Sequence, residues 1–255
     1  APNSIGVNGN YINWNIVETS HDINVSRDLT LLGLISKTGE LTMEGTTGAD
    51  GTGSGNGLWI TKYLELDGII DLQGESQLVQ KRYTYTPAQF YESILDEDSG
   101  GYLERDQQGT RNSFNYNYWS SMVGPVSGNT ATRGTGLPST NANYTVAGAL
   151  LDGSLADDGT YPRAIDFVNG AYAADEARAT PLKITNRWIY KFHGTDDLYA
   201  AWARIGSGGS LYPGEGYTMK GTDGTVPLAT KQNYAFRGKP YNGDFTIPIT
   251  VKSLS

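Results

Sequence analysis

The sequence predicts an all-β protein: a short N-terminal β-solenoid (parallel β-helix-like) segment, then a β-sandwich-like, strand-rich domain with long loops. Three observations favour this class: glycine supplies 33 of the 255 residues, only 18% of residues are charged, and tyrosine (17) outnumbers phenylalanine (6). Abundant glycine suits many turns between short strands, and tyrosine suits half-exposed pleated surfaces. We place the solenoid-like repeat at residues 1–80 and the sandwich-like domain at residues 81–255.

The first segment carries a repeated pattern of leucine, a spacer, an apolar residue, a spacer and glycine. It occurs in "DLTLLG" (28–33), "ELTMEG" (40–45) and "YLELDG" (63–68), and apolar alternation continues through "GIIDLQGESQLVQ" (68–80). Alternation with a period of two predicts strands with one buried face. Repeats this short cannot bury their apolar faces alone, so they must stack, either in a β-solenoid or in a meander within a sandwich. We favour the parallel β-helix.

The rest of the chain divides into turns, one expected helix and several strands. The glycine-rich "TTGADGTGSGNG" (46–57) predicts a loop, and "TPAQFYESILDEDSG" (86–100) predicts a helix because Thr-Pro suits a cap and first turn. Residues 124–182 predict long loops with short strands. Further strands are expected at 186–192, 214–221, 233–240 and 244–251, and residues 196–205 predict one or two helical turns.

"FNYNYWSSMVG" (114–124) is the densest aromatic stretch of the chain. In a strand, Phe114, Tyr116 and Tyr118 share one face and Trp119 lies on the other. If the face with three rings is buried, Trp119 lies on the exposed side, where a ring among amides suits contact with a carbohydrate. The alternative, which we favour, is that Trp119 caps the core between loops. Further candidates for stacking on a glycan are Trp59, Trp188 and Tyr212.

Few residues suited to catalysis are present. The chain has no cysteine and two histidines, His21 and His193, without zinc-site spacing, a nucleophile elbow or a phosphate-binding glycine motif. Paired carboxylates could hydrolyse glycosides, but most acidic residues neighbour glycine or lie in turns, where aspartate bonds to its own backbone. We expect no enzyme activity.

Two acidic clusters are candidates for calcium binding, because carboxylate oxygens in turns are the ligands that calcium prefers. They contain Asp96 and Asp98 in "DEDSGG", and Asp157 and Asp158 before Gly159. No other cofactor is expected.

The net charge of −8 argues against binding to nucleic acid or to an anionic membrane surface. No apolar run approaches the roughly 20 residues that span a bilayer. A cysteine-free, acidic chain rich in Gly, Thr and Asn is typical of a bacterial extracellular protein. Its start at Ala1 fits either a cleaved signal peptide or an arbitrary boundary.

Several segments, in the same order, resemble a module of Bacteroidota (Flavobacteria-type) cell-surface and adhesin-like proteins that the type IX system secretes. These segments are residues 103–126, 181–192, 214–222 and 233–249, preceded by the solenoid-like "IDLQGESQLVQ" (70–80). The resemblance implies a location at the bacterial cell surface and no enzymatic residues. It also implies further domains and a C-terminal sorting domain after "NGDFTIPI", whereas this chain ends at "TVKSLS". We therefore expect a fragment, a processed form or a homologue with another use for its last strand.

The sequence thus predicts a non-enzymatic extracellular structural or adhesive protein, in one version the self-assembling subunit of a filament. Its partners would be copies of itself or other cell-surface proteins. Open sheet edges of a solenoid and the strand expected at 244–251 would support such pairing. The alternative is a carbohydrate-binding module of a secreted glycan-degrading protein, with glycans as ligands.

Overall fold

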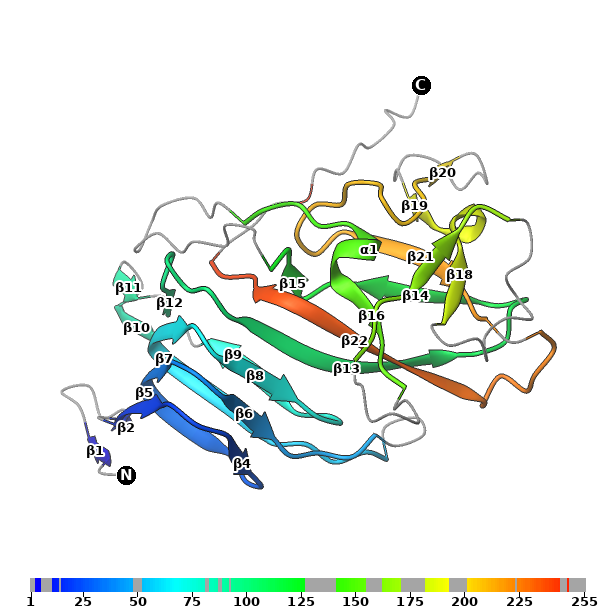
Figure 1. Cartoon of the computed structure of the whole chain (residues 1–255). Helices are drawn as coiled ribbons and strands as arrows, with labels where there is room; N and C mark the ends of the chain where they lie inside the picture. The colour runs from blue at the N-terminus through cyan, green and yellow to red at the C-terminus, as the bar shows by residue number, and fades with distance from the viewer. Residues whose placement is uncertain are drawn as a thin grey trace. The chain divides into compact units, whose positions relative to one another are not determined.

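The computed structural model describes residues 3–5, 11–13, 15–47, 52–80, 83–86, 89–91, 93–126, 141–154, 162–170, 182–192, 201–222, 224–243 and 247. Nearly all of its regular structure is β-strand, so the predicted all-β class is confirmed (Figure 1). The chain forms two compact units. Unit 1 contains Ala1–Asp106, Val126–Ala142 and Arg237–Phe245, and unit 2 contains Gln107–Pro125, Asn143–Phe236 and Thr246–Ser255.

Unit 1 is built from two parallel sheets that successive strands enter alternately. The first sheet has the order β12-β7-β5-β3, with β9 also paired to β7, and the second contains β13-β8-β6-β4. Their bounds are β3 Ile16–Thr19, β4 Ile23–Val25, β5 Leu29–Ser36, β6 Glu40–Met43, β7 Gly57–Leu66, β8 Ile69–Leu72, β9 Gln77–Gln80, β12 Ile94–Leu95 and β13 Tyr102–Thr110. In Figure 1 the arrows of β4, β6 and β8 point the same way. The strands expected from the repeated pattern are therefore present.

Aliphatic side chains in register hold each parallel sheet together. In the second sheet, Leu41 of β6 lies opposite Ile70 of β8, which lies opposite Leu103 of β13. In the first sheet, Leu34 lies opposite Leu64, which lies opposite Leu95 of β12. All of these side chains are buried, so the alternation seen in the sequence marks the core.

Gly33, which closes the first repeat of the sequence pattern, lies within strand β5 and not in the turn that follows it. The register between β5 and β7 shifts between Leu31 and Gly33, and this bulge moves the buried set from Leu31 to Leu34. A one-residue shift changes which face each side chain occupies. Gly39, by contrast, lies in the turn between β5 and β6. Its φ of 77° favours glycine.

The helix expected over residues 86–100 is wrong. That stretch contains the end of β10 (Tyr83–Thr86), β11 (Gln89–Tyr91) and β12 (Ile94–Leu95). The two residues of β12 extend the parallel ladder of β7, and this non-local pairing outweighs the local helix signal. Strands β10 and β11 pair antiparallel with each other, as do β1 (Asn3–Ile5) and β2 (Tyr11–Asn13).

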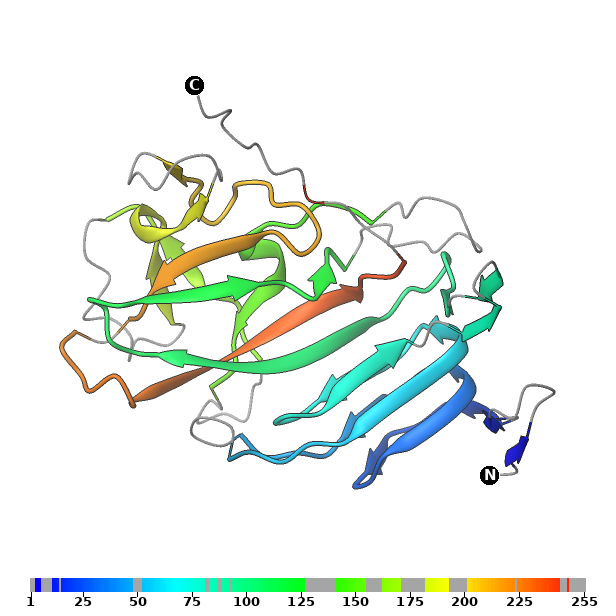
Figure 2. The same ribbon diagram turned by 180° about the vertical axis from the view of Figure 1, so that it is seen from behind.

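Unit 2 contains an antiparallel sheet with the order β14-β21-β19-β20. Figure 2 shows β21, in orange, beside the green β14. The bounds are β14 Tyr116–Ser120, β19 Tyr190–Phe192, β20 Trp202–Arg204 and β21 Gly216–Lys220. The strands expected at 214–221 and 186–192 are confirmed, the second only from Tyr190, because a 3-10 helix (η1, Asn186–Trp188) precedes it. The helical turns expected at 196–205 are wrong for Trp202–Arg204, which pair with β19.

Strand β22 (Lys231–Pro240) begins in unit 2, and its last four residues belong to unit 1. Strand β16 (Leu150–Asp152) pairs antiparallel with β22, and β15 (Val123–Gly124) is another neighbour of β22. Helix α1 (Val146–Ala149) precedes β16, and β17 (Asp166–Val168) pairs parallel with β18 (Lys183–Thr185). The strand expected at 233–240 is confirmed, whereas the one expected at 244–251 lies outside the described residues apart from Ile247.

Candidate functional site

One face of the antiparallel sheet in unit 2 is covered with aromatic rings. Tyr116 and Tyr118 project from the same side of β14 because they are two residues apart. The pairing register places Thr218 of β21 opposite Tyr118, and Tyr190 of β19 opposite Thr218. Trp202 of β20 lies opposite Phe192 on the same face. The antiparallel register thus brings the rings of β14 together with those of β19 and β20, which come much later in the sequence.

A cavity of about 230 Å³ opens on this face. Its lining consists of Tyr116, Tyr118, Trp188, Tyr190, Trp202 and Thr218. Thr218 is the one small side chain in the row between Tyr118 and Tyr190, so the hollow forms where a third ring would otherwise stand. Tyr118 is 74% exposed, and its ring centroid lies 6.5 Å from that of Trp202. Exposed rings around a concave floor are typical of a ligand pocket.

A cation supplied by the chain lies beside this pocket. Lys220 is paired with Tyr116 across the sheet, and its Nζ lies 5.3 Å from the centroid of the Tyr116 ring and 4.0 Å from that of Trp188. Both distances fall in the cation–π range. Burial lowers the pKa of Lys220. The Arg187 guanidinium lies 5.3 Å from the centroid of Trp188, so two cationic groups, Lys220 and Arg187, lie near that ring.

Trp119, a predicted glycan contact, lies on the opposite face of the sheet. Its side chain is 7% exposed and its centroid lies 5.6 Å from that of Tyr234 and 6.0 Å from that of Phe236. The favoured alternative, a core position, agrees with this burial. The face that carries Tyr116 and Tyr118 is the exposed one, because Trp119 and Tyr217 fill the interior of unit 2.

The other three residues that were predicted to stack on a glycan do not lie together in one site. Trp188 lines the pocket. Tyr212 is 42% exposed and stands outside the pocket lining, with Lys191 Nζ 5.9 Å from its ring centroid. Trp59 belongs to β7 of unit 1, where it is half-buried and opposite Thr30 and Val79 in the parallel ladder.

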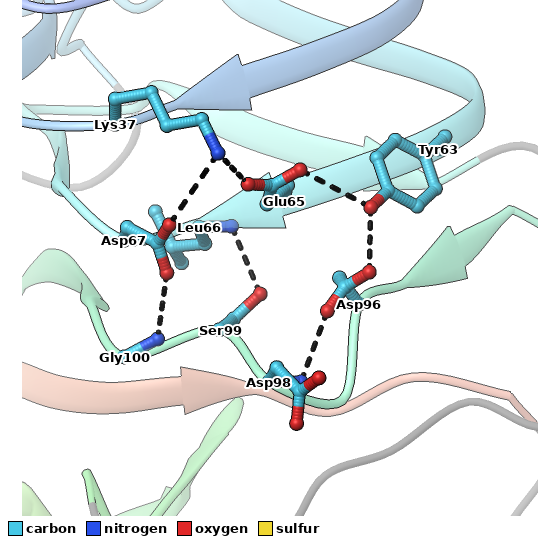
Figure 3. A network of polar contacts seen from close by, with 9 residues as sticks. All are labelled: Lys37, Tyr63, Glu65, Leu66, Asp67, Asp96, Asp98, Ser99 and Gly100. Atoms are coloured by element: carbon cyan, nitrogen blue, oxygen red, sulfur yellow. Dashed lines mark hydrogen bonds and ion pairs between the residues drawn. The ribbon is translucent and has the colours of Figure 1, made fainter.

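The structure brings the calcium candidates Asp96 and Asp98 together in the turn after β12, but their contacts are those of a turn (Figure 3). Asp96 accepts a hydrogen bond from the Tyr63 hydroxyl at 2.5 Å and another from the Asp98 backbone N–H at 3.0 Å. The hydrogen bond to Asp96 raises the pKa of Tyr63. Asp98 is exposed.

The same network ties this turn to neighbouring strands. Lys37 forms ion pairs with Glu65 and Asp67, and Asp67 accepts a hydrogen bond from the Gly100 backbone N–H at 3.0 Å. The described residues contain no group of three acidic or histidine side chains suited to a metal. Asp157 and Asp158 lie outside the described residues.

A pair of buried carboxyl groups lies in unit 1. Asp71 of β8 and Glu104 of β13 are direct cross-strand neighbours, and they are 5% and 6% exposed. Burial is the main cause that raises the pKa of Asp71 to about 7, and nearby carboxylates add to it while the Gln73 side chain opposes it. Burial also raises the pKa of Glu104, which the Arg237 guanidinium opposes. Arg237 Nη2 lies 2.5 Å from Glu104 Oε1.

Sequence reasoning missed five of the six lining residues, Tyr116, Tyr118, Tyr190, Trp202 and Thr218, and also the neighbouring Lys220. The alternation of residues 114–119 does place Tyr118 and Trp119 on opposite faces. The stacking hypothesis took the face of Trp119 as the exposed one, whereas the face of Tyr118 is exposed. Trp202 and Lys220 gave no local signal, because only strand pairing brings them next to the rings.

The fold and the site define an all-β protein with an aromatic, cation-flanked pocket on one sheet. Comparison with protein-family models, curated proteins and solved structures finds no match to this chain. In the part of the chain that the structure describes, no helix has the length and apolar character needed to cross a membrane.

Proposed function

We propose that this protein is a non-enzymatic, extracellular carbohydrate-binding protein whose site is the aromatic pocket of unit 2. The observation that carries the proposal is the lining of that pocket, five rings around Thr218. Tyrosine and tryptophan present an apolar face and a polar edge. A sugar ring has the matching pattern, with C–H bonds on its faces and hydroxyls at its rim.

The size of the pocket supports a small ring as the ligand. Its volume of about 230 Å³ lies below the range of about 300–1,000 Å³ of pockets for drug-sized molecules. One sugar residue of a longer chain fits this scale, with neighbouring residues continuing over the exposed ring of Tyr118. A surface protein that holds one residue of a glycan would act as an adhesin, which agrees with the acidic, cysteine-free composition and with the resemblance to cell-surface proteins.

A cationic ligand, the other common occupant of aromatic cages, fits less well. Lys220 already places its ammonium group 4.0 Å from the centroid of Trp188. A quaternary or methylated ammonium entering the pocket would meet like charge there. The buried position of Asp71 and Glu104 supports the non-enzymatic part of the proposal, since glycosidase carboxylates flank a cleft that the substrate enters.

The test is a glycan array probed with the wild-type protein, Tyr118→Ala and Trp202→Ala. Phe114→Ala is the matched control, because Phe114 is 68% exposed and outside the pocket lining. We expect the two pocket variants to lose binding to the glycans that the wild type and the control retain. Equal binding by all four proteins, or no binding by the wild type, refutes the proposal.

A second candidate function is self-association through unit 1. We infer that its two parallel sheets form a short solenoid, since the strands enter them alternately. Ile16 is 63% exposed on β3, the end strand of its sheet among the described residues. An exposed apolar residue on an edge strand favours pairing with another copy. Sedimentation velocity of the wild type and Ile16→Lys tests this: concentration-dependent oligomers that the variant lacks support it, and a monomer at all concentrations refutes it.

A further inference from the structure

We propose that the aromatic pocket selects acidic sugars, with Lys220 as the group that binds the sugar carboxylate. This inference rests on the proposed function and adds the charge of the ligand to it. It is based on the placement of positive charge around the rings.

Lys220 lies at the border of the pocket. Its Nζ lies against the rings of Tyr116 and Trp188, both of which line the cavity. No ion pair joins Lys220 to an acidic side chain among the described residues. The ammonium group therefore meets the aromatic faces within this part of the chain, and its hydrogen-bond donors are available to a ligand.

Positively charged side chains share the sheet face with the rings. Arg204 lies two residues after Trp202 on β20 and opposite Tyr190, so it shares the face with the rings. Arg187 adds a third positive charge beside Trp188. The face positions of the four strands carry no Asp or Glu. Such a surface is locally positive on a chain whose net charge is −8.

An acidic sugar matches this combination of aromatic rings and positive charge. A uronic acid presents a carboxylate at the rim of the same ring whose faces stack on aromatic side chains. An ammonium group binds a carboxylate by charge-assisted hydrogen bonds, which are stronger than neutral ones. Partial burial of Lys220 lessens competition from water and salt for that contact. A neutral hexose stacks equally well, but its hydroxyls accept a weaker hydrogen bond from Lys220 than a carboxylate does.

The experiment compares uronic acid oligosaccharides with their carboxyl-reduced, neutral counterparts, which keep the same linkage and ring. Binding of a panel of such pairs is measured by calorimetry for the wild type, Lys220→Gln, Lys220→Arg and Lys239→Gln. The last variant removes one positive charge from β22 in unit 1 and is the control for net charge.

We expect the wild type to bind the acidic member of a pair about tenfold more tightly, the effect of one hydrogen bond to a charged group. Lys220→Gln is expected to abolish this preference while keeping the affinity for the neutral member, and Lys220→Arg and Lys239→Gln to retain it. Equal affinity of the wild type for both members, or an unchanged preference in Lys220→Gln, refutes the selection of acidic sugars but leaves the glycan site standing. Absence of binding to every member of the panel also refutes the selection of acidic sugars, whereas the glycan site itself is tested by the glycan array.

Discussion

The buried carboxyl group of Asp71 makes the stability of unit 1 depend on pH, and Asp71→Asn removes that dependence. Asp71 is 5% exposed and lies opposite Glu104 on the neighbouring strand. Burial is the main cause that disfavours the charged form of Asp71, and the nearby carboxylates of Asp106, Glu40 and Glu104 add to it. Asparagine has nearly the same shape and can still accept the hydrogen bond that Gln73 Nε2 donates at 3.0 Å.

The magnitude follows from the two pKa values. The pKa of Asp71 is about 7 in the folded protein and 3.8 in the reference state. Between these values the folded state binds more protons than the unfolded state, so stability falls as the pH rises from about 4 to about 7. A difference of about 3 in pKa, at about 1.4 kcal/mol for each, corresponds to about 4 kcal/mol above pH 7. Below pH 4 the carboxyl group is protonated in both states and the penalty disappears.

The assay is urea denaturation of the wild type and Asp71→Asn at several pH values from 4 to 8. We expect the variant to exceed the wild type in unfolding free energy by about 2–4 kcal/mol at pH 8 and by less than about 1 kcal/mol at pH 4. Glu97→Gln, which removes one exposed charge from the turn after β12 in the same unit, is the control for net charge. A variant that is less stable than the wild type at pH 8, or a difference independent of pH, would show that the reasoning about Asp71 is wrong.

Three further predictions concern stability and can be checked by chemical denaturation. Trp119→Ala is expected to lower the unfolding free energy by about 3–5 kcal/mol, because the ring is 7% exposed and its removal leaves a cavity; a loss below about 1 kcal/mol would contradict a core role. Tyr217→Phe is expected to leave stability unchanged or to raise it by up to about 1 kcal/mol, since the buried hydroxyl has no hydrogen-bond partner among the described residues. A clear loss would reveal a partner. Gly39→Ala is expected to cost more than about 1 kcal/mol, because φ is 77° and a Cβ would stand 2.5 Å from the His21 carbonyl carbon. An unchanged midpoint would mean that the backbone there relaxes freely.

Local patterns in the sequence predict most of unit 1, and the reason is visible in its ladders. Leu41 and Leu64 each begin a repeated apolar pair, and parallel pairing sets Leu41 opposite Ile70 and Leu64 opposite Leu34, so that apolar residues of alternate strands stack within each sheet. The helix expected at 86–100 failed because Ile94 and Leu95 pair with β7, about thirty residues earlier in the chain. A pattern within residues 86–100 carries no information about the energy of pairing with a strand so far away in the chain.

The pocket of unit 2 was the harder part to predict. Alternation in residues 114–119 separates two faces but does not say which is buried, because tyrosine and tryptophan tolerate both environments. Tyr234 and Phe236, more than a hundred positions later, determine that the ring of Trp119 is inside. The rings of Tyr118 and Trp202 meet only through pairing of β14, β21, β19 and β20.

The short side chain of Thr218 determines the depth of the cavity between the tyrosines on either side of it. Replacing Thr218 with a bulkier residue would fill the cavity, and replacing it with alanine would deepen the cavity. Neither change removes a strand or its pairing. The shape of this surface therefore depends on a single residue, so variation at this position alone would change the size of the ring that the proposed glycan site accepts.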